Sequence, residues 1–423
     1  MTTITPPTIL VLFGATGDLA RLKILPALRE LWISGQLSRN FKLITVGRRE
    51  MSTEEYVKYL AEIAPHPFTH DLSILGMEYV CVDFDVEDGF NPLRQIMEKY
   101  RGAHVLYYMS VGPDVLELSI DQFSQPDYRR TINSAQSAII VEKPFGENLA
   151  DARELNRKLQ SIFGVRNIFR NDHYLNKATV QAIVPIRETD PEMQKLLTKD
   201  ELGEVQIVVA EKVDVGTRAG YFDGRGMVID WMQSHMLQVL ATLFADLGDD
   251  NFGLSKAEFI DSLSLVPHSL IRAQYAGYSD IQGVNPELET ETFFATQFTS
   301  DIKKWQGVTF SLIAGKAMAE KEVMINLRLR HEHPKLGNTI KLYIDPSGGH
   351  ALLDNQASGD EYQLTIMQAI RDEWDKFVSQ QEVEAQWRIT EKVRAAFKEI
   401  PLEYYVKGTS YKHFCTETWC ISV

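Results

Sequence analysis

Cysteine and long apolar runs are scarce in this chain of 423 residues. The three cysteines, Cys81, Cys415 and Cys420, form an odd and sparse set without the close spacing of a zinc site, which argues against a disulfide framework or a metal centre. No stretch reaches the roughly 18–20 consecutive apolar residues of a membrane-spanning helix. The first residues also lack the basic and apolar character of a signal peptide. These absences predict a cytoplasmic protein with no membrane partner and no metal.

Basic residues are also fewer than acidic residues. The chain has 44 Lys and Arg against 58 Asp and Glu, a formal net charge of −14. A protein that follows a nucleic-acid backbone needs a basic face, so we expect no nucleic-acid partner. The hydrophobic content of 44% and the charged content of 24% are typical of a globular chain with a large core. At about 150 residues per domain, the length indicates two or three domains.

Short apolar runs alternate with helical patterns over residues 1–170. This alternation is typical of βαβ units and predicts a parallel sheet in a Rossmann-like, dinucleotide-binding α/β domain. The runs that we expect to form its strands are residues 8–13, 41–46, 79–82, 104–109 and 138–141.

The pattern changes over residues 171–423, where strands are grouped around one long helix at 227–245. We expect an α+β domain with a mixed, largely antiparallel sheet. Its predicted strands are residues 205–210, 294–298, 307–313 and 323–329. A helix at 362–377 and a less regular tail complete the expected order.

A glycine-rich turn follows the first predicted strand. Gly14, Gly17 and Ala20 are spaced G-x-x-G-x-x-A, which departs from the standard G-x-G-x-x-G. A turn of this kind brings the backbone close to a pyrophosphate at a helix N-terminus, although a purely structural βα turn is the alternative. The residues that we expect to hold the coenzyme here are Gly14, Ala15, Thr16, Gly17, Asp18 and Leu19.

Two arginines, Arg48 and Arg49, follow the second predicted strand, where an NAD-binding protein normally places an acidic residue. Two guanidinium groups suit a 2′-phosphate and offer no acceptor to a free 2′-hydroxyl. NADP is therefore the expected cofactor, with NAD left open. The alternative is a solvated turn.

Polar residues gather at three later places. Lys143 follows the strand ending at residue 141, at the sheet edge where ligands bind in open parallel sheets. Asp172 precedes His173 and Lys177, which would share one face of a helix that starts after Asp172 and would suit a phosphate monoester. For these residues the alternatives are a solvated lysine, a helix cap and a surface histidine.

Asp230 and His235 lie on the long predicted helix. On an α-helix their side chains would lie about 140° apart, so they could meet one ligand only if it lay across that end of the helix. An imidazole in a partly dry cleft is a common general base near neutral pH. A core histidine is the alternative, since Met232 and Met236 lie beside it in the sequence.

In their order and spacing, these segments resemble the glucose-6-phosphate dehydrogenase family, and the match runs through most of the chain. The segments that carry the resemblance are Gly14–Ala20 with Arg21 and Lys23, Glu142–Gly146, Asp172–Lys177, Glu211, Gly220–Asp223, Asp230–His235 and Gly315–Met318. The resemblance implies an oxidoreductase of the EC 1.1.1 class that oxidises C1 of glucose 6-phosphate to the 6-phospho-lactone with NADP, the first step of the pentose phosphate pathway.

The resemblance also implies roles for single residues. His235 would take the proton from the C1 hydroxyl, and Asp172 would pair with His235 and orient it. His173, Tyr174 and Lys177 would hold the sugar phosphate. The further substrate-binding residues that it implies are Lys143, Glu211, Asp230, Lys316 and Lys321. Lys143 is also expected among the residues that bind the coenzyme. A cis bond before Pro144 is left open.

The chain departs from the family pattern at several places, among them Ala178 for a usual Glu and Arg187–Asp190 for a usual Arg-Phe-Ala/Gly-Asn. Asn171 stands where the family usually has an apolar residue, and residues 337–359 are a brief passage where typical members have further strands. Family members commonly dimerise through that sheet, so a homo-oligomer is expected but its interface is open. Two alternative functions stay open: the same chemistry on another sugar phosphate, and a non-catalytic paralogue that binds nucleotide.

Overall fold

The computed structural model describes residues 8–63, 76–86, 88–133, 136–248, 251–344 and 360–422. The chain forms two compact units, Met1–Asn176 with Ser358–Val378 and Lys177–Ala357 with Ser379–Val423. A single division at residue 170 does not describe this arrangement, because a late segment of the chain returns to the first unit.

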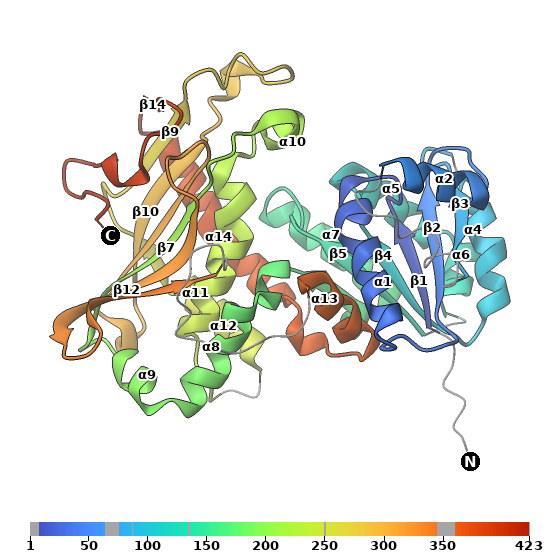
Figure 1. The fold of residues 1–423 in the computed structure, drawn as a ribbon, viewed down its shortest axis with the longest axis horizontal. Helices are drawn as coiled ribbons and strands as arrows, with labels where there is room; N and C mark the ends of the chain where they lie inside the picture. The colour runs from blue at the N-terminus through green and yellow to red at the C-terminus, as the bar shows by residue number, and fades with distance from the viewer. Residues whose placement is uncertain are drawn as a thin grey trace. The chain divides into compact units, whose positions relative to one another are not determined.

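The first unit is built on a parallel sheet of six strands in the order β3-β2-β1-β4-β5-β6 (Figure 1). Its strands are β1 (Thr8–Phe13), β2 (Lys42–Gly47), β3 (Glu78–Cys81), β4 (His104–Met109), β5 (Gln136–Glu142) and β6 (Ile168–Asn171). Every residue of β1 is buried, as expected for a central strand covered on both faces. The predicted α/β class and the five predicted strands are confirmed, and β6 is additional.

Helices cover this sheet. They are α1 (Leu25–Ile33), α2 (Thr53–Ile63), α4 (Asn91–Met97), α5 (Pro113–Ser124), α6 (Pro126–Asn133), α7 (Leu149–Phe163) and α13 (Glu361–Ile370). The last belongs to the returning segment, and its Ile366 is fully buried in the core that α1 also lines. The helix predicted at 362–377 ends early, because Asp372 adopts a left-handed φ of 58° that an α-helix cannot continue.

The second unit contains an eight-stranded mixed sheet in the order β13-β12-β7-β11-β10-β9-β14, with β8 paired to β10. Its strands are β7 (Leu202–Ala210), β8 (Leu263–Leu265), β9 (Ile271–Tyr275), β10 (Phe293–Ser300), β11 (Thr309–Gly315), β12 (Glu322–His333), β13 (Gly337–Tyr343) and β14 (Glu403–Tyr405). β7 pairs parallel to β11 and β14 pairs parallel to β9, while the other pairs are antiparallel. The predicted mixed, largely antiparallel sheet is confirmed.

Helices α8 (Ala178–Thr189), α9 (Pro191–Leu196), α10 (Ala219–Phe222), α11 (Leu237–Phe244), α12 (Phe252–Asp261) and α14 (Gln380–Phe397) also belong to this unit (Figure 1). The predicted helix at 227–245 is interrupted: its first part, Val228–Met236, is π-helical. We call this stretch the π-segment.

Two further expectations were wrong. Residues 337–359 were expected to lack strands that typical members have, but β13 occupies their beginning and pairs with β12; residues 345–359 lie outside the described residues. The tail after 377 was expected to be less regular, but it contains the 18-residue helix α14, which starts with a capping box between Ser379 and Glu382.

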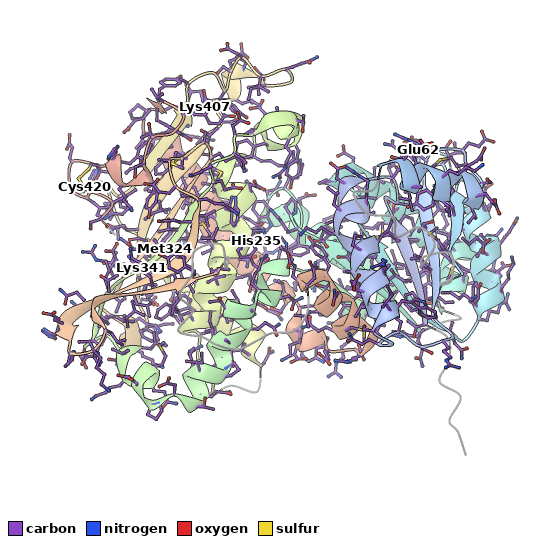
Figure 2. The ribbon with its side chains drawn as sticks, viewed as in Figure 1. Glu62, His235, Met324, Lys341, Lys407 and Cys420 are labelled. Carbon is purple, nitrogen blue, oxygen red and sulfur yellow. A yellow bond between two sulfur atoms is a disulfide. The ribbon has the colours of Figure 1, made fainter. Side chains whose placement is uncertain are left out.

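The cysteine prediction was also wrong, because Cys415 and Cys420 form a disulfide (Figure 2). They are paired by an antiparallel bridge across a short turn, in which the Thr416 N–H donates to the Trp419 carbonyl over 2.6 Å. This backbone turn brings their Cα atoms to 4.0 Å, a proximity that the spacing alone does not reveal. Among the described residues, no helix has both the length and the apolar character needed to span a membrane.

Candidate active site

The glycine-rich turn lies where β1 passes into the helix after it. Gly14 has φ 74°, and a Cβ there would strike the backbone carbonyl of Ser110, so only glycine fits. The Gly17 N–H closes the turn on the Gly14 carbonyl at 2.8 Å. The Asp18 side chain is exposed, whereas the Thr16 side chain is half-buried. This open backbone turn at a helix start fits the pyrophosphate of a dinucleotide.

Arg48 and Arg49 are exposed after β2, in the same unit as the turn. The Arg49 carbonyl accepts from the Tyr79 hydroxyl at 2.8 Å, and its guanidinium lies 5.2 Å from the centre of the Tyr59 ring. The Tyr59 hydroxyl in turn donates to the Thr16 carbonyl over 3.4 Å. Tyr59 therefore connects Arg49 to the glycine turn, which leaves a cation beside the place expected for the ribose.

Lys143 follows Glu142 at the carboxyl end of β5, and the Lys143–Pro144 bond is cis. The Glu142 carboxylate accepts from the Tyr108 hydroxyl at 2.6 Å and from the Asn171 amide at 2.9 Å. Burial raises the pKa of Glu142, while these two hydrogen bonds act in the opposite direction. Asn171, one of the departures from the family pattern, thus has a partner in the strand beside it.

The segment after β6 is wound differently from the prediction. A 3₁₀ turn covers His173–Asn176, and α8 begins only at Ala178, with Lys177 extended at its N-cap. His173 and Lys177 are therefore not one helical turn apart on a common face. Asp172 is 2% exposed, and its Oδ1 accepts from the Tyr174 N–H at 3.1 Å. The His173 ring stacks on Tyr362 with 5.8 Å between ring centres.

In the second unit, the π-segment carries Asp230 and His235 (Figure 2 labels His235), which are 5% and 3% exposed. In a π-helix the hydrogen bond runs from residue i to i+5, so residues five apart lie on nearly the same face. The two side chains are therefore not separated by the 140° of an α-helix. Trp231, between them, meets His235 edge to face at 5.4 Å.

Charged groups from three elements meet at Lys316, which is 3% exposed. Its Nζ donates to Glu211 Oε2 at 2.7 Å and lies 3.8 Å from Asp230 Oδ2. Glu211 also accepts from the Trp231 indole at 3.2 Å. The structure thus joins Glu211, Asp230 and Lys316 in one cluster, while Lys321 is an exposed residue beyond it.

The comparisons with known proteins agree along the chain. Residues 11–182 match the glucose-6-phosphate dehydrogenase NAD binding domain, and residues 184–347 match the C-terminal domain of the same family. The chain is 33% identical over 350 residues to glucose-6-phosphate 1-dehydrogenase 2 of Mycobacterium tuberculosis, which covers 76% of this chain and 68% of that protein. It is 30% identical over 396 residues to glucose-6-phosphate 1-dehydrogenase of Helicobacter pylori, covering 89% and 90%.

The chain belongs to the glucose-6-phosphate dehydrogenase family. Its structure is similar to that of a glucose-6-phosphate dehydrogenase solved in complex with glucose 6-phosphate. The TM-score is 0.84 at 25% identity, over 96% of this chain and 95% of that one. Family and fold class are therefore as the sequence predicted.

Sequence reasoning missed one group beside the site of this family member. Glu291 is buried, and its Oε1 accepts from the Val228 N–H at 3.0 Å, at the first residue of the π-segment. Burial raises its pKa to about 7, although the hydrogen bond from Val228 acts to lower it. No motif marks Glu291, and only the burial of a carboxylate in the fold reveals it.

The predicted site residues fall into two groups, each described within its own unit. The first unit contains the glycine turn, Arg48, Arg49, Lys143 and Asp172 through Tyr174, and the second contains Lys177, Glu211, Asp230, His235, Lys316 and Lys321. The pairing of Asp172 with His235 joins the two groups and stays a prediction. Asp223, from one of the family segments, has a structural role, since it accepts from Tyr278, Thr290 and the Asn285 N–H.

Proposed function

We propose that this protein oxidises the C1 hydroxyl of glucose 6-phosphate to the 6-phospho-lactone, with NADP as hydride acceptor. The observation that carries the proposal is the π-segment, which sets the buried His235 and Asp230 on one face, with Asp230 beside Lys316 and Glu211. Family membership supplies the substrate class.

In this proposal the protein's residues divide the work. His235 takes the proton from the C1 hydroxyl as C1 loses its hydride and the C1–O bond becomes a carbonyl. Asp172 orients the imidazole and stabilises the imidazolium that forms. Asp230, Glu211 and Lys316 bind sugar hydroxyls, with Lys143 and Lys321 at the edge of the substrate.

The sugar phosphate is held by His173, Tyr174 and Lys177 in this scheme. A cation and an imidazole close to a helix start favour a phosphate dianion. Such an anchor fixes the distant end of the substrate and so holds C1 in place, which contributes to catalysis through orientation.

The coenzyme fits the first unit because Gly17 and Asp18 of the glycine turn are exposed and Tyr59 connects Arg49 to that turn. The bound nicotinamide would supply the acceptor for the C1 hydride. The turn would hold the pyrophosphate, and Arg48 and Arg49 would bind the 2′-phosphate that distinguishes NADP from NAD. We further propose that the enzyme is cytoplasmic and a homo-oligomer. Light scattering of the purified protein would test the oligomeric state, and cell fractionation the location.

The experiment that tests the function is turnover by the purified protein. Glucose 6-phosphate and NADP should give a steady rise in reduced-nicotinamide absorbance, with a higher kcat/KM than NAD gives. If the protein did not turn over glucose 6-phosphate but was active on another sugar phosphate, that other sugar phosphate would be assigned as the substrate. Coenzyme binding without turnover on any sugar phosphate would instead support the non-catalytic paralogue.

The base assignment predicts the effect of His235→Asn. The variant should lower kcat by about 10²–10⁴-fold, the usual contribution of a general base, and leave the KM for the sugar phosphate nearly unchanged. Lys177→Ala should do the reverse and mainly raise KM. His413→Asn, the same change at an exposed histidine of the C-terminal tail, is the control. Near-normal kcat in His235→Asn would remove His235 from the mechanism.

A further inference from the structure

A group of buried polar side chains in the second unit lacks hydrogen-bond partners. Gln233, Gln386 and Thr390 are 0%, 1% and 0% exposed, yet both amide atoms of each glutamine and the threonine hydroxyl have no partner. The Ser234 hydroxyl and the Gln238 amide nitrogen are also buried without a hydrogen-bond partner. Buried polar groups are satisfied in nearly all native proteins, so such a concentration needs a physical explanation.

These side chains come from two helical stretches that pack against each other, α14 and the π-segment with α11. Near the start of α14, Glu382 lies 2.6 Å from Lys256 Nζ, which also reaches Gln238 on α11 at 3.5 Å. Near its end, Arg394 is close enough to act on Glu291, which binds the first residue of the π-segment. The two stretches are therefore antiparallel.

This alignment places the unpartnered groups opposite one another. Gln386 and Thr390 follow Glu382 by one and two turns on the same face of α14. Gln233 and Ser234 precede Gln238 by about one turn on the facing stretch. The groups thus lie between the Lys256–Glu382 ion pair at one end and Glu291 at the other.

The chemistry of the groups indicates what satisfies them. Amides and hydroxyls offer both donors and acceptors, and the charges of Lys256 and Glu382 at one end of the group compensate each other. A metal cation would face amide N–H groups, whereas water can donate and accept. Buried waters commonly satisfy two to four such groups at once.

We propose that water molecules enclosed between α14 and the π-segment bridge these side chains, and that Gln386 and Thr390 are thereby positioning residues for His235 and Asp230. The catalytic part of this inference rests on the proposed function. The physical reason is the register of the π-segment: a return to α-helical winding would move His235 about 140° away from Asp230 around the helix. The water-mediated bridge from the π-segment to α14 is proposed to stabilise the π-helical register relative to α-helical winding.

The test compares Thr390→Val, which removes only the hydroxyl, with Thr390→Ser, which keeps it. Thr296→Val is the matched control, because Thr296 in β10 is also fully buried with an unpartnered hydroxyl. Thr390→Val and Gln386→Met should lower kcat by about tenfold to a hundredfold at nearly constant KM, as misplaced reacting groups do. Thr390→Ser should retain most of the activity and Thr296→Val all of it. Equal losses in Thr390→Val and Thr296→Val would overturn the positioning role.

Two readouts do not depend on turnover, and so separate this inference from the proposed function. Amide hydrogen exchange over Val228–Met236 should become faster in Thr390→Val and stay unchanged in Thr296→Val. A crystal structure of the wild-type protein at high resolution should show ordered water between Gln386 and the π-segment. Direct hydrogen bonds between the two glutamines, with no water, would contradict the bridge even in an active enzyme.

Discussion

Arg49 is the single residue on which the coenzyme preference can be tested most directly. Its contact with Tyr59, and the contact of Tyr59 with the glycine turn, hold the guanidinium near the expected 2′-phosphate. A hydrogen bond to a charged group contributes about 1.5–3 kcal/mol. Arg49→Ala should therefore lower kcat/KM with NADP by about 10–100-fold and leave kcat/KM with NAD nearly unchanged, as measured by steady-state kinetics with each coenzyme.

Arg39→Ala is the control for this experiment. Arg39 is also exposed, but it precedes β2 and so lies at the opposite end of that strand from Arg48 and Arg49. It should affect neither coenzyme. An equal loss of kcat/KM with NADP and NAD in Arg49→Ala would mean that Arg49 supports the glycine turn and does not bind the 2′-phosphate.

At the scale of single residues, the sequence predicted candidate site residues but not which residues they contact. Lys316, Glu211 and Asp230 were predicted separately, and the fold joins them because β7 and β11 end close to the start of the π-segment. The hydrogen bond from Asn171 to Glu142 likewise depends on the pairing of β5 with β6. Contacts between distant elements leave no local pattern in the sequence.

At the scale of elements, Glu291 predicts a pH dependence of stability. Its pKa is about 7 in the folded protein against an ordinary value of 4.5. Between these values the folded protein holds a proton that the unfolded chain has lost. The free energy of unfolding should therefore fall as pH rises from 4.5 towards 7, by an amount on the order of 3 kcal/mol, and the full contribution is present only below 4.5.

Glu291→Gln should flatten this dependence, because the amide stays neutral and its oxygen can still accept from the Val228 N–H. Urea unfolding at several pH values between 4.5 and 8 measures the effect. Glu287→Gln, at an exposed position of the same loop, should leave the slope as in the wild type. A slope that persists in Glu291→Gln would assign the pH dependence to another group.

Secondary structure was predictable where burial dominated the local pattern. The strands of the parallel sheet are short apolar runs with turns after them, so their positions follow from composition. The winding of the π-segment could not be predicted, since its apolar spacing also suits an α-helix. α14 was missed although Ser379 and Glu382 form the capping pattern, because its buried residues include polar ones such as Gln386.

For the whole molecule, family membership and fold class were accessible from the order of the motifs, whereas the path of the chain was not. The segment around α13 returns to the first unit after the chain has built most of the second. Its Thr365 donates to Asn171 over 3.1 Å, and Ile366 and Phe377 fill the core beside α1. The local sequence of α13 does not indicate which of the two sheets the helix packs against.

This return predicts that residues 1–176 do not fold stably by themselves. Without the returning segment the core loses Ile366, which is 0% exposed, and Phe377, which is 5% exposed, and each large-to-small loss in a core costs about 2–5 kcal/mol. That is comparable to the whole stability of a domain. The fragment should show no cooperative thermal transition by circular dichroism, whereas the fragment joined by a flexible linker to residues 358–378 should regain one. A cooperative transition in residues 1–176 alone would show that the returning segment only covers a core that is already complete.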